Sequence, residues 1–137
     1  MGAWGTGVFD NDTACDWAYG LEEQDGLALI ERTLDTVLAA GDEYVDASDA
    51  EEALAAIEAI ARLQGHWGVR NSYSANVDAW VDKVKLQPPA ALASKAHAAI
   101  DRILGDGSEI LELWEDSEQL DEWKQEVDDL RLRVHLT

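Results

Sequence analysis

Three aspartates near the amino terminus are the side chains best suited to chemistry. Asp10, Asp12 and Asp16 carry carboxylate oxygens, which are the ligands that Mg²⁺ and Ca²⁺ prefer in proteins. The surrounding residues lack the glycine and the closing glutamate of a calcium-binding loop. Helix capping also explains an aspartate here, because its oxygen accepts from the free N–H groups of a first helical turn. We expect Asp10 or Asp12 to cap a helix, and we expect no metal ion and no cofactor.

A second candidate site is the loop at residues 65–73, which interrupts the helical pattern. It contains His66, Trp67, Arg70 and Tyr73. Exposed aromatic and arginine side chains are frequent anchors of protein–protein interfaces, and this loop lies in the least acidic part of the chain. These four residues are therefore predicted to bind a partner protein.

The residues favour a protein without catalytic activity, although an enzyme stays the alternative. Acidic neighbours surround the single cysteine, Cys15, and they raise the pKa of a thiol, so we expect it to be inert. The alternative is a small metal-dependent hydrolase that uses the N-terminal carboxylates together with His66. This activity requires the N-terminal loop and the loop at 65–73 to meet, because general acid–base groups act within hydrogen-bond reach.

Net charge is the unusual bulk property of the chain. The 137 residues include 29 acidic and 10 basic side chains, for a net charge of −19 at pH 7. Such a charge repels phosphate backbones and anionic lipid, so we expect neither nucleic acid nor a membrane as a partner. The sequence contains no apolar run of bilayer length and no secretion-signal pattern. A lone cysteine fits a reducing compartment, and a cytoplasmic location is predicted.

The acidity has three explanations, which stay open. Residues 1–65 carry 15 acidic and 2 basic side chains, and residues 66–107 carry 4 and 5. A solvated surface, adaptation to a salty cytoplasm and a docking face for a basic partner would each produce this pattern. Without a catalytic set, we predict a non-enzymatic protein-interaction module of immunity or adaptor type. Its partner is an unidentified protein, which is basic if the third explanation holds.

Periodic apolar residues and glycine or proline stops predict helices along the whole chain. Ser48 and Glu51 fit a capping box at the start of an alanine-rich helix. No alternating run predicts a strand. The fold class is therefore all-α, a single compact domain over residues 1–137 of about five to seven helices, preceded by a Gly/Trp-rich loop. The expected helices cover residues 12–23, 27–40, 48–63, 74–84 and 90–104, with one or two more after residue 108.

The N-terminal motif at residues 1–17 resembles the opening of a known family. The residues that carry the resemblance are Trp4, Gly5, Gly7, Phe9, Asp10, Asn11 and Asp12, followed by Ala14 and Asp16. The helix ending at Gly65 and the segment 108–114 are similar as well. The chain thus looks like an uncharacterised bacterial family, domain of unknown function 4259. The resemblance implies a small, mostly helical, acidic protein and no assigned reaction. From the residues themselves, we expect the glycines to permit either a positive φ or close backbone approach, while Trp4 and Phe9 are buried.

Overall fold

The computed structural model describes residues 3–136, in which helices joined by loops make up the chain. Positions 1 and 2 of the N-terminal motif and position 137 of the predicted domain lie outside the described residues. Isolated bridges, and no strands, accompany the helices in the described part. The all-α prediction is confirmed, at the upper end of its helix count. The seven helices are α1 (Asp12–Glu22), α2 (Ala28–Leu38), α3 (Ala47–Leu63), α4 (Ala75–Val84), α5 (Ala90–Ile103), α6 (Glu109–Glu115) and α7 (Leu120–Arg133).

Helix α3 is the centre of the molecule. From Ala53 to Leu63 every residue is buried, and the helix packs on each of the other helices described. Small alanine side chains allow neighbouring helices to come close on several sides, and a helix that is apolar all round must be interior. The alanine-rich sequence thus produces a central helix with little contact to water.

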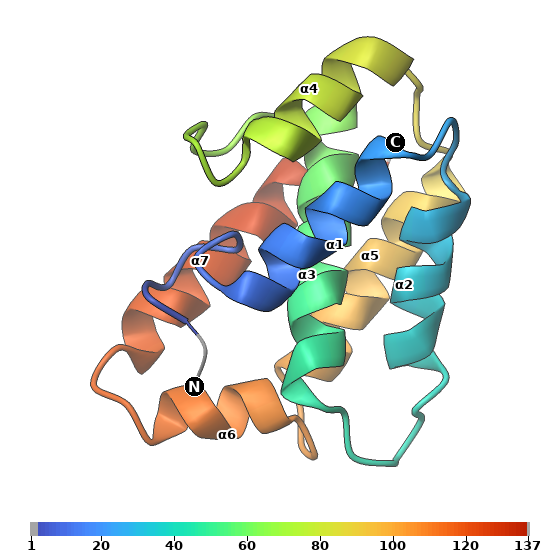
Figure 1. Ribbon diagram of the computed structural model, residues 1–137. Helices are drawn as coiled ribbons and strands as arrows, with labels where there is room; N and C mark the ends of the chain where they lie inside the picture. Colours follow the sequence, from blue (N-terminus) through green and yellow to red (C-terminus); the bar gives the residue numbers. More distant parts are fainter. Residues whose placement is uncertain (1–2, 137) are drawn as a thin grey trace.

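The other helices enclose α3 (Figure 1). Helix α1 crosses its middle, α2 and α5 pack together on one side, and α7 lies on the other. Helices α4 and α6 lie at opposite ends of α3. Buried indoles tie these elements together: the Trp17 Nε1–H donates to Thr33 Oγ1 at 2.9 Å and the Trp80 Nε1–H donates to the Gln24 carbonyl at 2.8 Å. None of the helices in residues 3–136 has the length and apolarity needed to cross a bilayer.

The predicted cap of α1 is wrong by one residue. Asn11, and neither Asp10 nor Asp12, is the N-cap, because its Oδ1 accepts from the Ala14 N–H at 2.8 Å while its Nδ2 donates to the Val8 carbonyl at 3.2 Å. Asparagine offers an acceptor and a donor on one side chain. It therefore fixes both the helix start and the preceding loop, which an aspartate could not do.

The predicted capping box of α3 is also wrong. The helix begins at Ala47, and no side-chain cap comes from its own first turn. Instead the Ala47 N–H donates to Glu109 Oε1 of α6 at 2.7 Å. Beside it, Val45 N–H donates to the Gly107 carbonyl at 2.9 Å and Glu109 N–H donates to the Val45 carbonyl at 3.0 Å. A residue distant in sequence thus replaces the local cap.

Candidate functional site

The glycine-rich N-terminal loop wraps around the side chain of Asp10. Gly7 N–H donates to Asp10 Oδ2 at 3.0 Å, and Trp4 N–H donates to the Asp10 carbonyl at 2.8 Å. A Cβ added at Gly5 would lie 2.5 Å from Asp10 Oδ2, and one added at Gly7 would lie 2.8 Å from it. Both positions therefore need glycine for close approach, as expected. Asp10 organises this loop.

The N-terminal loop and the loop at 65–73 meet at the surface. Trp4 and Tyr73 pack with ring centroids 5.2 Å apart, and they stay 48% and 47% exposed. The expected burial of Phe9 is confirmed and that of Trp4 is wrong, since Trp4 pairs with a second surface ring. Val69, 73% exposed, belongs to the same loop as Tyr73. Two segments distant in sequence thus expose aromatic surface together.

Trp67 and Arg70 form a second pair in the loop at 65–73. The Arg70 guanidinium lies 4.1 Å from the centroid of the half-buried Trp67 ring, within cation–π range. Arg70 Nε also lies 3.7 Å from Asp78 Oδ2, and its side chain is about half exposed. Arg70 therefore keeps a positive charge at the surface while its partners restrain its direction.

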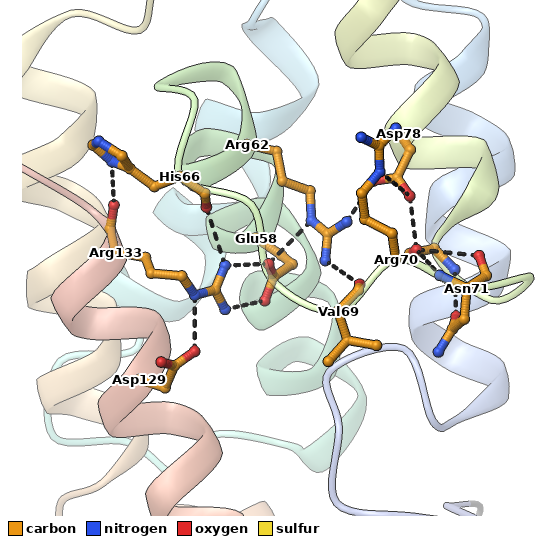
Figure 2. Close-up of polar contacts among 10 residues, drawn as sticks. Glu58, Arg62, His66, Val69, Arg70, Asn71, Asp78, Asp129 and Arg133 are labelled. Atoms are coloured by element: carbon orange, nitrogen blue, oxygen red, sulfur yellow. Dashed lines mark hydrogen bonds and ion pairs between the residues drawn. The ribbon is translucent and has the colours of Figure 1, made fainter.

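Beneath the two loops lies a buried network of charged side chains (Figure 2). Arg62, only 2% exposed, donates through Nε to Glu58 at 3.1 Å, through Nη1 to Asp78, and through Nη2 to the Val69 carbonyl at 2.8 Å. Arg133 donates from Nη1 and Nη2 to the Glu58 carboxylate at 2.6 and 2.9 Å. Each guanidinium nitrogen of Arg62 is thus engaged, as a buried charge requires.

The network also fixes the loop above it. Asp78 Oδ2 accepts from Ser74 Oγ at 2.8 Å, and Ser74 Oγ accepts from the Asn71 N–H at 2.9 Å. Asn71 Oδ1 in turn accepts from the backbone N–H groups of Tyr73 and Ser74. The backbone that presents Tyr73 is therefore held by bonds that reach the core.

Phe9 and Trp67 cover the Arg62 guanidinium from the two loops. Its central carbon lies 5.7 Å from the Phe9 ring centroid and 5.8 Å from that of Trp67. Both distances fall within the range of a cation–π contact. The N-terminal motif, the second loop and the central helix thus meet at one arginine.

Sequence reasoning missed Glu58, Arg62 and Asp78, and a signal for the first two was available. Between residues 53 and 63 they are the charged residues of an otherwise apolar helix. A helix without a polar face is buried, so charges four residues apart on it must pair inside the protein.

A pocket of about 160 Å³ opens between the loops and the network. Its lining combines residues of the two loops with charged side chains of α3 and α7: Thr6 to Asp10, Val69, Asn71, Ser74, Glu58, Arg62, Glu126, Asp129 and Arg133. Burial first, and then the negative charges of Asp129, Glu58 and Asp10, raise the pKa of Glu126, while Arg133 opposes the shift. Burial alone would lower the pKa of Arg133, but Glu58 and Asp129 raise it overall. Carboxylates outnumber guanidinium groups in the lining of this pocket, so the pocket favours positively charged groups over negatively charged ones.

His66 is turned away from the other predicted binding residues. Its Nδ1 lies 2.8 Å from the Arg133 carbonyl, and its ring lies 4.0 Å from that of His135. Figure 2 shows the charged network lying between His66 and Arg70. The structure therefore pairs Tyr73 with Trp4 and Arg70 with Trp67, while His66 contacts Arg133 and His135 instead.

The remaining predicted candidates are dispersed. Asp12 and Asp16 are exposed on α1, and Asp10 is held by Gly7. The two loops do meet, as the hydrolase alternative requires, but no three His, Cys, Asp or Glu side chains of residues 3–136 are grouped to hold a metal ion.

The pKa of the Cys15 thiol is raised, first by burial and then by the negative charges of Asp12, Asp16 and Asp10. Its Sγ donates to the Phe9 carbonyl at 3.3 Å.

A match to a known protein family covers the N-terminal motif and most of the charged network. The family model described as Domain of unknown function (DUF4259) matches residues 2–126. The chain belongs to the DUF4259 family. Neither the curated proteins nor the solved structures contain a significant match to the chain. Within the chain, the DUF4259 match covers Trp4, Tyr73, Glu58, Arg62 and Asp78 and ends before Arg133 and His135. Family membership assigns no activity to any of these residues.

Proposed function

We propose that this protein binds another protein through the surface formed by Trp4, Val69, Arg70 and Tyr73, and that it acts as a non-enzymatic immunity- or adaptor-like module. The observation that carries the proposal is the exposed pair of Trp4 and Tyr73, with ring centroids 5.2 Å apart. Large aromatic side chains and arginine dominate the energy of protein interfaces. Here they stand on loops that hydrogen bonds to Asp10 and Asp78 hold in place.

Rigid support favours binding because little conformational entropy is lost when the partner arrives. The Trp4 backbone is bonded to Asp10 at 2.8 Å, and the Tyr73 N–H donates to Asn71 Oδ1 at 2.9 Å. Both aromatic side chains therefore start from restrained backbones. Such a preorganised pair is suited to anchor an interface.

The charge of the chain indicates the chemistry of the partner. The protein carries −19 overall, and Asp10, Glu126 and Asp129 line the pocket beside the aromatic pair. A basic protein surface would be drawn to this side, and its association rate would fall as salt rises. An aromatic or aliphatic side chain of the partner would pack on Trp4 and Tyr73. Basic residues of the partner would lie against the acidic side chains of the pocket.

The proposal is tested by quantitative affinity purification with the intact chain and a Trp4→Ala/Tyr73→Ala variant. Tyr19→Ala is the matched control, because Tyr19 is an exposed aromatic residue of α1, 61% accessible, outside this surface. We expect a protein that co-purifies with the intact chain and with the control but is lost with the double variant. With that partner purified, the double variant should weaken the affinity at least about tenfold.

Two results would contradict the proposal. The first is that no protein is enriched over the double variant at low or moderate salt. The second is that a purified partner binds the double variant as tightly as the intact chain. Circular dichroism of each variant shows whether the fold is kept, so a loss of binding can be separated from unfolding.

A further inference from the structure

The end of α7 and the residues after it are held by side chains from α5 and from the loop that follows α3. Besides the contact of His66 with the Arg133 carbonyl, His97 Nε2 lies 2.7 Å from the Val134 carbonyl. Gln64 completes the arrangement, because its Nε2 donates to the His135 carbonyl at 2.7 Å and its Oε1 accepts from the His135 N–H at 2.9 Å. The backbone of His135 is thereby fixed, while its ring lies at the surface.

The hydrogen bond of His66 decides which of its nitrogens is free. A carbonyl oxygen only accepts, so the Nδ1 of His66 must carry the proton that it shares with Arg133. In the neutral ring, Nε2 then holds a lone pair. Histidines that bind metal ions in proteins nearly always donate their other ring N–H to a carbonyl or carboxylate in this way.

We propose that His66 and His135 form a binding site for one divalent transition-metal ion of the Zn²⁺, Ni²⁺ or Cu²⁺ type. The ring centroids lie 4.0 Å apart and the planes are inclined by 35°. His66 Nε2 supplies one ligand. Because His135 is exposed, its ring turns about its side-chain bonds to bring a nitrogen to the same ion, and water completes the coordination.

The surroundings fit this class of ion. Both histidines line a surface pocket of about 370 Å³, together with Gln64, Gln87, Pro88 and Leu136. Imidazole nitrogens suit Zn²⁺, Ni²⁺ and Cu²⁺, whereas Mg²⁺ and Ca²⁺ require several oxygen ligands. The neighbouring Arg133 guanidinium does not oppose a cation in this pocket, because it is directed into the network and paired with Glu58 and Asp129. The overall charge of −19 attracts cations.

The experiment uses the full chain without a polyhistidine tag. Zn²⁺ is titrated by calorimetry, Mg²⁺ serves as the oxygen-preferring control, and Cu²⁺ is followed by electron paramagnetic resonance to count nitrogen donors. We expect one Zn²⁺ per chain, no heat of specific binding from Mg²⁺, and two nitrogen donors on Cu²⁺. Zn²⁺ binding should also weaken as the pH is lowered, because protons compete with metal ions for imidazole nitrogens.

Three variants separate the site from the fold. His66→Asn keeps a donor near the Nδ1 position, and so the bond to Arg133, while it removes Nε2. His135→Ala removes the second ligand. His97→Gln is the matched control, because its amide donor replaces Nε2 toward the Val134 carbonyl. The first two should each weaken Zn²⁺ binding at least about tenfold, with unchanged circular dichroism, and the control should bind normally. Unchanged affinity in either ligand variant, or no Zn²⁺ binding by the intact chain, would overturn the proposal.

Discussion

The carboxylate of Glu58 accepts two hydrogen bonds from the guanidinium of Arg133, which lies 75 residues further along the chain. Glu58 belongs to the central helix and Arg133 to the last turn of α7. Burial removes most competing water from this pair, since the Glu58 side chain is only 5% exposed. The pair therefore fastens the end of the chain to the core.

Neutralising Glu58 should destabilise the protein strongly. In Glu58→Gln, Arg62 keeps Asp78 and Arg133 keeps Asp129, but both guanidinium groups lose their shared partner, and breaking a buried ion pair costs about 3–5 kcal/mol. Urea unfolding measures the loss. The control is Asp129→Asn, which removes the exposed partner of Arg133 (carboxylate 62% exposed) and should cost less than about 1 kcal/mol. Equal losses in the two variants would show that burial of Glu58 is not decisive.

The long-range cap of α3 yields a paired prediction. Glu109→Ala leaves the Ala47 N–H without its acceptor and should cost about 1 kcal/mol, as for loss of an N-cap. Ser48→Ala removes the residue that the sequence pattern would choose, yet it should be neutral or slightly stabilising because alanine favours helices. Thermal unfolding distinguishes the cases. A larger loss of stability in Ser48→Ala than in Glu109→Ala would instead support a capping box formed by Ser48.

Gly5 and Asp10 should be energetically coupled. In Gly5→Ala the new Cβ would come within 2.5 Å of Asp10 Oδ2, so the carboxylate must move and its bond to Gly7 is lost, at about 1–2 kcal/mol. In an Asp10→Ala background the same change should cost much less, and a double-mutant cycle measures the difference. Gly20→Ala in α1, with no neighbour within 4 Å, should instead stabilise by up to about 1 kcal/mol. Additive effects of Gly5→Ala and Asp10→Ala would refute the coupling.

Cys15 should react slowly with alkylating reagents. Its raised pKa, caused by burial and by Asp12, Asp16 and Asp10, lowers the fraction of thiolate at neutral pH. The rate of modification by iodoacetamide, followed against pH, should have a midpoint above the value of about 8.5 for a free cysteine. The double variant Asp12→Asn/Asp16→Asn should shift the midpoint down, though not fully, since burial remains. A midpoint at or below that of free cysteine would contradict this account.

Glu126 should make the protein less stable as pH rises through its raised pKa. The folded carboxyl holds its proton to higher pH than the unfolded one, so its contribution to stability is fully present below the unfolded pKa of about 4.3 and is lost as pH rises through the folded pKa. Glu126→Gln should therefore stabilise the protein at pH 7. The gain should be only about 0.5 kcal/mol, because Glu126 is exposed to solvent, which screens its interactions. At about pH 3.5 the two proteins should match, and a constant difference across pH would exclude ionisation as the cause.

The helices could be predicted because the residues that start, stop and orient each helix lie within or next to it in the sequence. Gly41 and Gly65 adopt positive φ just after α2 and α3, and glycine is the residue that tolerates this conformation. Apolar spacing on α7 places Trp123, Val127 and Leu130 inside, as observed. Such signals lie within a few residues of the structure that they specify.

The caps and the candidate site could not be predicted in the same way, because they join distant segments. The acceptor for Ala47 comes from α6, and the partner of the Trp4 ring comes from the second loop. The sequence predicts one binding site within the loop at 65–73, yet His66 contacts the Arg133 carbonyl while Tyr73 packs on Trp4. Only the path of the backbone decides which neighbours a loop residue meets.

Because α3 contacts every other helix described, we expect the protein to unfold as a single cooperative unit. No subset of helices retains a complete interior once α3 is lost, and from Ala53 to Leu63 α3 has no exposed residue. Limited proteolysis should therefore yield either the intact chain or small peptides, with no stable intermediate fragment. For the same reason, a graft of the binding loops onto another scaffold would have to carry the central helix with them.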